Sequence, residues 1–195
     1  MDALGVTIEK HLDKMGQRAT DTSAFALQDV RIPVENRIGE EGDGLKIAMA
    51  TLDATRPGTA IGAVGVAQAA YEHSVEYAKE RVTFDVPIAM HQGVNFMIAD
   101  MATEIEAARL LTWQAAWMLD QGERATLYSS FAKRFAADTA MKVTTDAVQV
   151  FGGYGYMKEY PVEKLMRDAK LFQIYEGTSQ IQRLVIAKEI FLPRG

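Results

Sequence analysis

The sequence predicts a mainly α-helical fold: a C-terminal antiparallel four-helix bundle preceded by a few β-strands. After residue 44, apolar residues recur at helical spacing along segments joined by short connections, which is the pattern of a bundle. Before residue 44, short alternating apolar runs are separated by glycine, proline and polar turn residues, which is typical of strands. The 195 residues are 48% hydrophobic and 24% charged, enough for a sizeable globular core.

The first 44 residues contain three candidate strands, whose apolar pairs are Val6 with Ile8, Phe25 with Leu27, and Val30 with Ile32. Two or three strands are too few for an independent sheet with a buried face. We therefore expect residues 1–44 to be the remnant of a β-domain and residues 45–195 to form the bundle.

Four helical segments are expected at about 45–79, 87–120, 124–150 and from 161 onward. Pro57 and Gly58 should interrupt the first segment with a kink or a bulge near its start, and the glycines at 152–155 should end the third. The fourth should pause near Glu176 and resume at Ser179, because Ser179 and Gln182 have the spacing of a capping box.

Several of these helices carry broad apolar stripes. In the second segment Met97, Met101 and Ile105 lie at helical spacing, and Trp113 and Trp117 lie one turn apart further on. Two tryptophans on a helix surface need cover, so we expect more than one buried face per helix and therefore a homo-oligomer.

Composition excludes several classes of function. The net charge of −5 argues against a nucleic-acid-binding surface, and the absence of cysteine excludes disulfides and thiolate chemistry. The first residues lack the features of a signal peptide, so we expect a protein that is not secreted. The apolar run at 60–70 is too short for a membrane span and instead indicates a close-packed interior helix.

Glu176 is the first candidate for chemistry. It lies between Tyr175 and Gly177, at the interruption between two predicted helical segments. A carboxylate shielded from water in such a place suits a general base. The alternative is a glutamate that interacts favourably with the positive end of the next helix, and spacing alone favours this alternative.

Other candidates are weaker. Arg81 and Thr83 could bind a phosphate together, or Arg81 could interact with the carbonyl groups at a helix end. The glycines at 152–155 could admit a ligand to the backbone or simply turn the chain. Asp53 and Arg56, near Pro57, could face a ligand or form an ion pair in solvent. No cluster of residues has metal-ligand spacing, so no metal site is expected.

Five stretches occur together in this chain. They are "DVRIPVENRIGEEGDG" at 29–44, "LDATRPG" at 52–58, "RVTF" with "PIAMHQ" within 81–92, "FGGYGY" at 151–156 and "YEGTSQIQR" at 175–183. Together they resemble the acyl-CoA dehydrogenase family, with the medium- and short-chain members most similar. The resemblance covers essentially the whole chain and only the C-terminal half of the family's length.

The resemblance implies an FAD-dependent oxidoreductase that dehydrogenates acyl-CoA thioesters between the α- and β-carbons, as in fatty acid β-oxidation. In the family a glutamate removes the α-proton, a hydride passes to the flavin, and electrons leave to electron-transferring flavoprotein. The resemblance assigns the catalytic base to Glu176. Some members carry the base at the position matching Thr55, which is not acidic here.

Further site residues are implied by the matching motifs. For FAD they are Arg81, Val82, Thr83, His91, Gln92, Gln149, Val150, Phe151, Gly152, Gly153, Thr178, Ser179 and Gln180, the set from Arg81 to Gly153 serving the FAD of a neighbouring subunit. For the substrate they are Asp53, Arg56, Tyr175 and Gly177. Asp85 stands where the family usually has glycine and adds a negative charge near the expected pyrophosphate.

Two functional readings follow. In the first, the chain is the C-terminal part of an acyl-CoA dehydrogenase, active only together with the rest. In the second, it is a non-catalytic oligomerisation or interaction module derived from that family. By resemblance the oligomer is a tetramer, and the compartment is a bacterial cytoplasm or the mitochondrial matrix.

Overall fold

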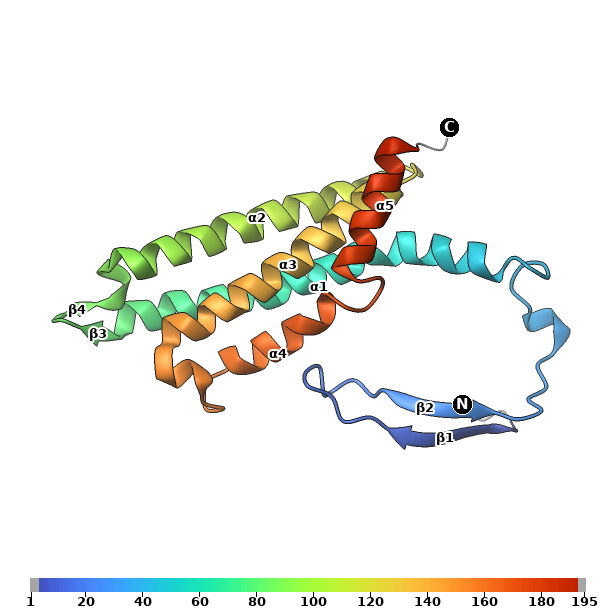
Figure 1. The fold of residues 1–195 in the computed structure, drawn as a ribbon, viewed down its shortest axis with the longest axis horizontal. Helices are drawn as coiled ribbons and strands as arrows, with labels where there is room; N and C mark the ends of the chain where they lie inside the picture. Colours follow the sequence, from blue (N-terminus) through green and yellow to red (C-terminus); the bar gives the residue numbers. More distant parts are fainter. Residues whose placement is uncertain (1–3, 193–195) are drawn as a thin grey trace.

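The computed structural model describes residues 4–192, which form a helical bundle with two short β-ribbons (Figure 1). The helices are α1 (Gly44–Glu80), α2 (Gln92–Asp120), α3 (Thr126–Phe151), α4 (Val162–Phe172) and α5 (Ser179–Phe191). The strands are β1 (Val6–His11), β2 (Ser23–Leu27), β3 (Val82–Thr83) and β4 (Val86–Pro87). Successive helices from α1 to α4 run in opposite directions, so the predicted mainly α, antiparallel bundle is confirmed.

Small residues make the core. The helix α3 packs against α1, α2, α4 and α5, and so lies at the centre of the bundle. It buries Ala132, Ala136, Ala137, Ala140, Val143 and Ala147, while α1 buries Ala60, Ala63, Val64, Ala67 and Ala70. Because alanine side chains are short, the two helix backbones can approach closely. The run at 60–70 is therefore an interior helix, as predicted.

The apolar stripe of α2 is also confirmed, because Met101, Ile105 and Ala108 are buried against the core. Trp113 and Trp117 lie outside this stripe, and each is 57% exposed. None of the helices within residues 4–192 is long and apolar enough to span a membrane.

Pro57 does not interrupt α1, contrary to the prediction. A proline has no N–H to give to the carbonyl group four residues earlier, here that of Asp53. The hydroxyl of Ser129, on α3, donates to that oxygen at 2.9 Å instead. The helix therefore continues through Pro57, and its missing hydrogen bond is replaced by one between helices.

Two other local predictions are wrong. Residues 30–32 form no strand, because no segment of the described chain pairs with them. A 3-10 helix at Val34–Asn36 follows instead. The cap of α5 lies one residue earlier than predicted: the Thr178 side chain accepts the N–H of Ile181 at 3.2 Å, and Ser179 is already the first helical residue.

The N-terminal ribbon is connected to α4. Strands β1 and β2 pair antiparallel, and Phe25 and Leu27 remain exposed on them. In the loop between them, the backbone N–H of Gln17 donates to the carboxylate of Asp168. Gly16 lies so close to α4 that an added Cβ would be 2.4 Å from the carbonyl oxygen of Arg167. The predicted ends of the two domains, residues 1–3 and 193–195, lie outside the described residues.

Candidate active site

Glu176 lies in the turn between α4 and α5. Its φ angle is 52°, and that of Gly177 is 89°, so two consecutive residues have positive φ values. The positive φ angle favours glycine at residue 177, and a Cβ atom there would lie 2.7 Å from Nε2 of Gln182, whose side chain would have to shift. A residue with a side chain adopts such an angle at a cost of about 1–2 kcal/mol, so contacts must hold Glu176 in place.

Two buried side chains provide those contacts. The ammonium group of Lys133, on α3, donates to the carbonyl oxygen of Gly177 at 2.6 Å. The side-chain amide of Gln182, on α5, donates to the carbonyl oxygens of Glu176 and Gly177, each at 3.1 Å. Lys133 and Gln182 are both 0% exposed. The two carbonyl groups that follow the Glu176 Cα atom are therefore tied to the bundle.

The carboxylate of Glu176 is oriented by α1. Thr55 Oγ1 donates to Glu176 Oε2 at 3.1 Å. The side chain of Glu176 remains partly exposed, so it can reach a ligand. The ring of the preceding residue, Tyr175, packs edge-on against Phe172 with centroids 5.6 Å apart. Burial raises the pKa of the Tyr175 hydroxyl.

Asp53 and Arg56 form an ion pair beside this turn. Arg56 Nη1 and Asp53 Oδ1 are 2.7 Å apart, and the other carboxylate oxygen of Asp53 accepts from Thr126 Oγ1 at 2.7 Å. Arg56 is only 4% exposed. Its guanidinium also lies near the turn, because an added Cβ at Gly177 would be 3.9 Å from Arg56 Nη2. The pair is therefore part of the site and not the solvent-facing alternative.

A groove opens from this ion pair between α1 and α5. It has a volume of about 620 Å³, and Asp53, Arg56, Arg124 and Thr126 lie along it with Lys46 and Lys188. Arg124 is paired with Glu189 at 2.7 Å. No ion pair is formed by Lys46 or Lys188 within residues 4–192. The groove therefore offers several cations, which suits a ligand with phosphate groups.

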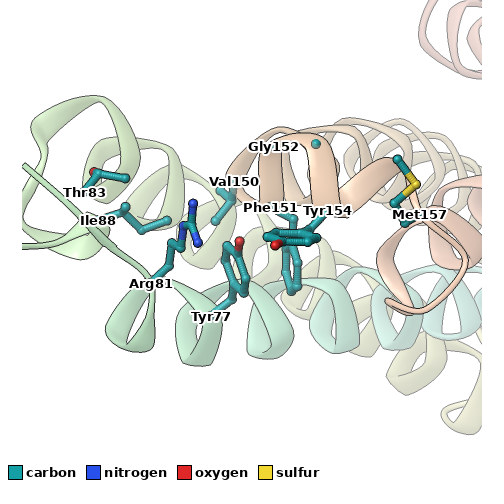
Figure 2. A pocket seen from close by; sticks show the side chains of 10 residues that line it. Tyr77, Arg81, Thr83, Ile88, Val150, Phe151, Gly152, Tyr154 and Met157 are labelled. Atoms are coloured by element: carbon teal, nitrogen blue, oxygen red, sulfur yellow. The ribbon is translucent and has the colours of Figure 1, made fainter.

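A second pocket, of about 480 Å³, lies at the β3–β4 end of the bundle. Figure 2 shows how it joins two distant parts of the sequence: Arg81 and Thr83 lie on one side, and residues 150–153 lie on the other. Tyr77 and Phe151 stack in its floor with ring centroids 4.1 Å apart. Burial raises the pKa of the Tyr77 hydroxyl.

Arg81 is the cation of this second pocket. Its guanidinium lies 5.8 Å from the centroid of the Tyr154 ring, and it forms no ion pair with the residues described. Thr83 Oγ1 is 3.0 Å from Nε2 of His91 and hydrogen-bonds with it. The hairpin turns at Phe84 and Asp85, with φ angles of 50° and 63°. An aspartate tolerates this conformation better than most residues, so Asp85 fits the turn.

Six of the thirteen residues predicted for FAD line one pocket. The second pocket is lined by Arg81, Thr83, Val150, Phe151, Gly152 and Gly153. His91 reaches it through Thr83. Val82, Gln92 and Gln149 are exposed and do not line the pocket.

The third predicted group, Thr178 to Gln180, lies at the first turn of α5. With Asp138 and Arg183 these residues line a cavity of about 420 Å³. The Ser179 hydroxyl donates to Asp138 at 2.8 Å and is thereby fixed to α3. In Figure 1 the start of α5 lies far along the bundle from the β3–β4 hairpin. One chain therefore does not bring the two sets of predicted FAD contacts together.

The comparisons with known proteins define the class first: residues 42–191 match the family model described as "Acyl-CoA dehydrogenase, C-terminal domain". The chain belongs to the acyl-CoA dehydrogenase family. It is 51% identical over 189 residues to a cyclohexane-1-carbonyl-CoA dehydrogenase of Geobacter metallireducens, covering 97% of this chain and 50% of that protein. It is 51% identical over 181 residues to a short-chain specific acyl-CoA dehydrogenase of Megasphaera elsdenii, covering 93% and 47%.

Solved structures agree. Butyryl-CoA dehydrogenase from Megasphaera elsdenii superposes with a TM-score of 0.95 and 49% identity, covering 97% of this chain and 49% of that one. A chain in a structure described as an electron transferring flavoprotein of Acidaminococcus fermentans gives 0.97 and 46%, covering 98% and 50%. The chain therefore spans about half the length of the relatives it matches.

Sequence reasoning missed four residues of the site: Lys133, Gln182, Arg124 and Thr126. Lys133 sits within the alanine stripe of α3, where helical spacing predicts core, and nothing nearby marks it as polar machinery. Arg124 and Thr126 flank the start of α3 and belong to no motif. The signal that could have found Lys133 is its charge on an apolar helix face, because a buried charge is unfavourable for folding unless it is paired. No group of three or more potential metal ligands is clustered within residues 4–192.

Proposed function

We propose that this chain supplies the C-terminal part of an FAD-dependent acyl-CoA dehydrogenase, with Glu176 as the base that removes the α-proton of an acyl-CoA thioester. The observation that carries the proposal is the construction of the Glu176 turn. Its backbone is held by Lys133 and Gln182, its carboxylate is oriented by Thr55, and a cationic groove begins beside it. Family membership supports the same role.

The groove suits the CoA part of the substrate. Its cations, among them Lys46, Arg124 and Lys188, would bind phosphate groups, while Leu45 and Met49 offer apolar contact. Asp53 and Arg56 lie where the groove meets the turn, and would place the thioester next to Gly177 and Tyr175. The chain thus binds and orients the substrate, and Glu176 takes the α-proton while the electron pair of that C–H bond stays with the substrate.

The second pocket fits part of a flavin nucleotide. Arg81 has no carboxylate partner among the described residues and lies near aromatic rings. A ligand with an anionic group and a planar ring could pair with Arg81 and pack against these rings. Arg81, Thr83, Gly152 and Gly153 would hold the pyrophosphate and adenosine. Thr178, Ser179 and Gln180 would hold a second FAD molecule at the start of α5. When bound, FAD supplies the acceptor for the β-hydride.

The same proposal includes the assembly and the partners. Because one chain separates the two FAD-binding sets, a complete site needs a neighbouring copy, which favours a homo-oligomer and, by family, a tetramer. Electron-transferring flavoprotein would accept the electrons. Residues 1–44 would belong to the middle β-domain of the complete enzyme, and residues 45–195 to the bundle domain. The bacterial origin of the relatives favours a bacterial cytoplasm over the mitochondrial matrix.

The test uses a fusion of this chain to the N-terminal half of the Megasphaera elsdenii dehydrogenase. The chain itself is 51% identical to that enzyme over 181 residues. Steady-state oxidation of butyryl-CoA with an artificial electron acceptor should be restored in the fusion, whereas the chain alone should turn over butyryl- or octanoyl-CoA slowly or not at all. Glu176→Gln should abolish turnover in the fusion, about 10⁴-fold or more, and leave flavin bound.

A control variant and two contrary results make the fusion experiment decisive. Glu104→Gln changes a carboxylate that pairs with Lys142 on the far side of α3, at 3.0 Å, and should leave turnover within twofold. Normal turnover by the Glu176→Gln fusion would remove Glu176 from the mechanism. A stable, flavin-loaded fusion that never oxidises acyl-CoA would reject the proposed function.

A non-catalytic oligomerisation module remains the second candidate function. The observation that favours it is the exposure of Trp113 and Trp117 on α2, at 57% each. A chain that forms a stable oligomer without flavin, and stays inactive in the fusion, would support it.

A further inference from the structure

A buried cation lies next to the candidate base, and the proposed function does not use it. Lys133 is 0% exposed within the alanine-rich face of α3. Its ammonium group has left water, which is unfavourable, and burial lowers its pKa to about 8, although Glu176 and Asp138 lie near enough to favour its charge. A methionine or leucine there would fill similar space at no such cost.

The polar contact of Lys133 is directed at the turn. Its ammonium donates to Gly177 O at 2.6 Å, one residue beyond the Glu176 Cα atom. The same oxygen also accepts from Gln182, so the turn would keep one donor if Lys133 were absent. Lys133 therefore adds a second, independent tie to a carbonyl group that is already satisfied. That redundancy points to precision of placement and not to satisfaction of a polar group.

Lys133 projects from the central helix of the bundle. The helix α3 packs against all four other helices, whereas the turn at 173–178 is irregular. Glu176 also has an unfavourable φ angle of 52°, so without ties its backbone would relax. A catalytic group must be held to within about half an ångström, and displacement by about 1 Å can cost 100-fold in rate.

We propose that Lys133 is a positioning residue: by holding the carbonyl group of Gly177 from α3, it fixes the backbone of Glu176 and thereby the place of its carboxylate over the substrate α-carbon. This inference rests on the proposed function and adds a residue to it. The hydrogen bond of Lys133 is to Gly177 O and not to the Glu176 carboxylate.

The test is Lys133→Met in the active fusion, at pH 7.5. The kcat for butyryl-CoA should fall about 10- to 100-fold, while KM and flavin content stay within about twofold. The melting temperature should stay the same or rise, because a buried charge is replaced by an apolar side chain of similar length. If Lys133 had only a structural role, kcat and the melting temperature would fall together. A lower kcat with an unchanged or higher melting temperature therefore indicates a positioning role.

A second readout isolates proton removal. In D₂O, a base at position 176 exchanges the α-hydrogen of bound butyryl-CoA for deuterium: one C–H bond breaks, one C–D bond forms, and no oxidant is needed. Exchange followed by NMR should slow in Lys133→Met by about the same factor as kcat. The matched control is Lys142→Met, the same change on the same helix at a half-exposed residue paired with Glu104, and it should leave both rates unchanged.

The outcomes separate the two claims. An inactive parent fusion would reject the proposed function itself. An active parent that loses activity with Glu176→Gln, but keeps full kcat and α-exchange with Lys133→Met, would overturn only the positioning role. A Lys133→Met fusion that fails to fold, or loses flavin in step with activity, would show a structural role and would also overturn it.

Discussion

Two buried cations, Lys133 and Arg56, lie on either side of the turn that carries Glu176. Arg56 is paired with Asp53, and Lys133 has only a carbonyl oxygen within hydrogen-bonding distance in the described residues. Burial therefore affects the charges of the two side chains differently. Arg56 is bonded to a carboxylate, whereas the lowered pKa of Lys133 makes its charge sensitive to mildly alkaline pH.

Lys133 should therefore make stability depend on pH. Burial lowers its pKa from 10.5 to about 8 in the folded chain. Between these values the unfolded chain binds the proton that the folded chain has released, so stability from this group rises with pH across that window. Below about pH 8 both states are protonated and the folded state bears the full cost. The free energy of unfolding of the parent relative to Lys133→Met should rise by up to about 3 kcal/mol from pH 8 to 10.5.

Urea unfolding of both proteins at intervals from pH 7 to 10.5 measures this difference. The tyrosines with raised pKa values, Tyr77 and Tyr175, are common to both proteins and cancel. The same comparison with Lys142→Met should show no rise, because Lys142 is half exposed and paired with Glu104. A difference that stays flat across the window would mean that Lys133 is better solvated than its burial indicates.

At the scale of elements, α1 continues through a proline because α3 supplies the missing donor. The Asp53 carbonyl oxygen accepts from Ser129 Oγ in place of the N–H that Pro57 lacks. The same residue, Asp53, pairs with Arg56 through its carboxylate. Because Pro57 has no N–H, the Asp53 carbonyl oxygen is free to accept from Ser129. This hydrogen bond joins α1 to α3 where the groove begins.

This coupling predicts a non-additive pair of mutations. Ser129→Ala alone should lower the free energy of unfolding by about 1–3 kcal/mol, because it leaves a buried carbonyl group unpaired. In a Pro57→Ala background the helix regains an N–H for that oxygen, so Ser129→Ala should cost clearly less. A double-mutant cycle by chemical denaturation gives the coupling, expected at about 1 kcal/mol. Equal costs in both backgrounds would mean that the two groups do not share the acceptor.

The same elements show how far the sequence leads. Helical spacing was sufficient for the buried faces of α2 and α3, because each face is made by neighbours three and four residues apart. It could not place the partner of the Asp53 carbonyl group, since Ser129 comes 76 residues later. The predicted strand at 30–32 failed for the same reason: a strand exists only with a partner, and none lies beside it.

The candidate site was predictable to the extent that its residues belong to contiguous motifs. Glu176, Arg81 and the glycines at 152–153 stand in such motifs, and the structure puts each at a turn or pocket. Lys133 and Gln182 act across the bundle, and their own surroundings in sequence look like core. Only the folded arrangement shows that both are directed at one turn.

At the scale of the whole molecule, the two sets of proposed FAD contacts lie apart on one chain (Figure 1). The set at the β3–β4 end has Arg81 as its cation, and the set at the start of α5 lines a separate cavity with Ser179 and Gln180. If one FAD molecule bridges two copies, each copy contributes a different half to two different sites. Loss of either half then disables every site in a uniform oligomer.

Complementation follows from this geometry. Two variants of the fusion are compared: one carries Arg81→Ala, and the other carries both Thr178→Ala and Gln180→Ala. Each variant should lose flavin when it is expressed alone. Co-expression of the two variant chains should restore flavin and turnover to about one quarter of the sites, namely those where an intact α5 set meets an intact Arg81 set. Flavin absorbance per protomer after gel filtration measures the restoration. If each site instead uses both sets from one chain, mixing two defective chains restores nothing, and the bridging arrangement is excluded.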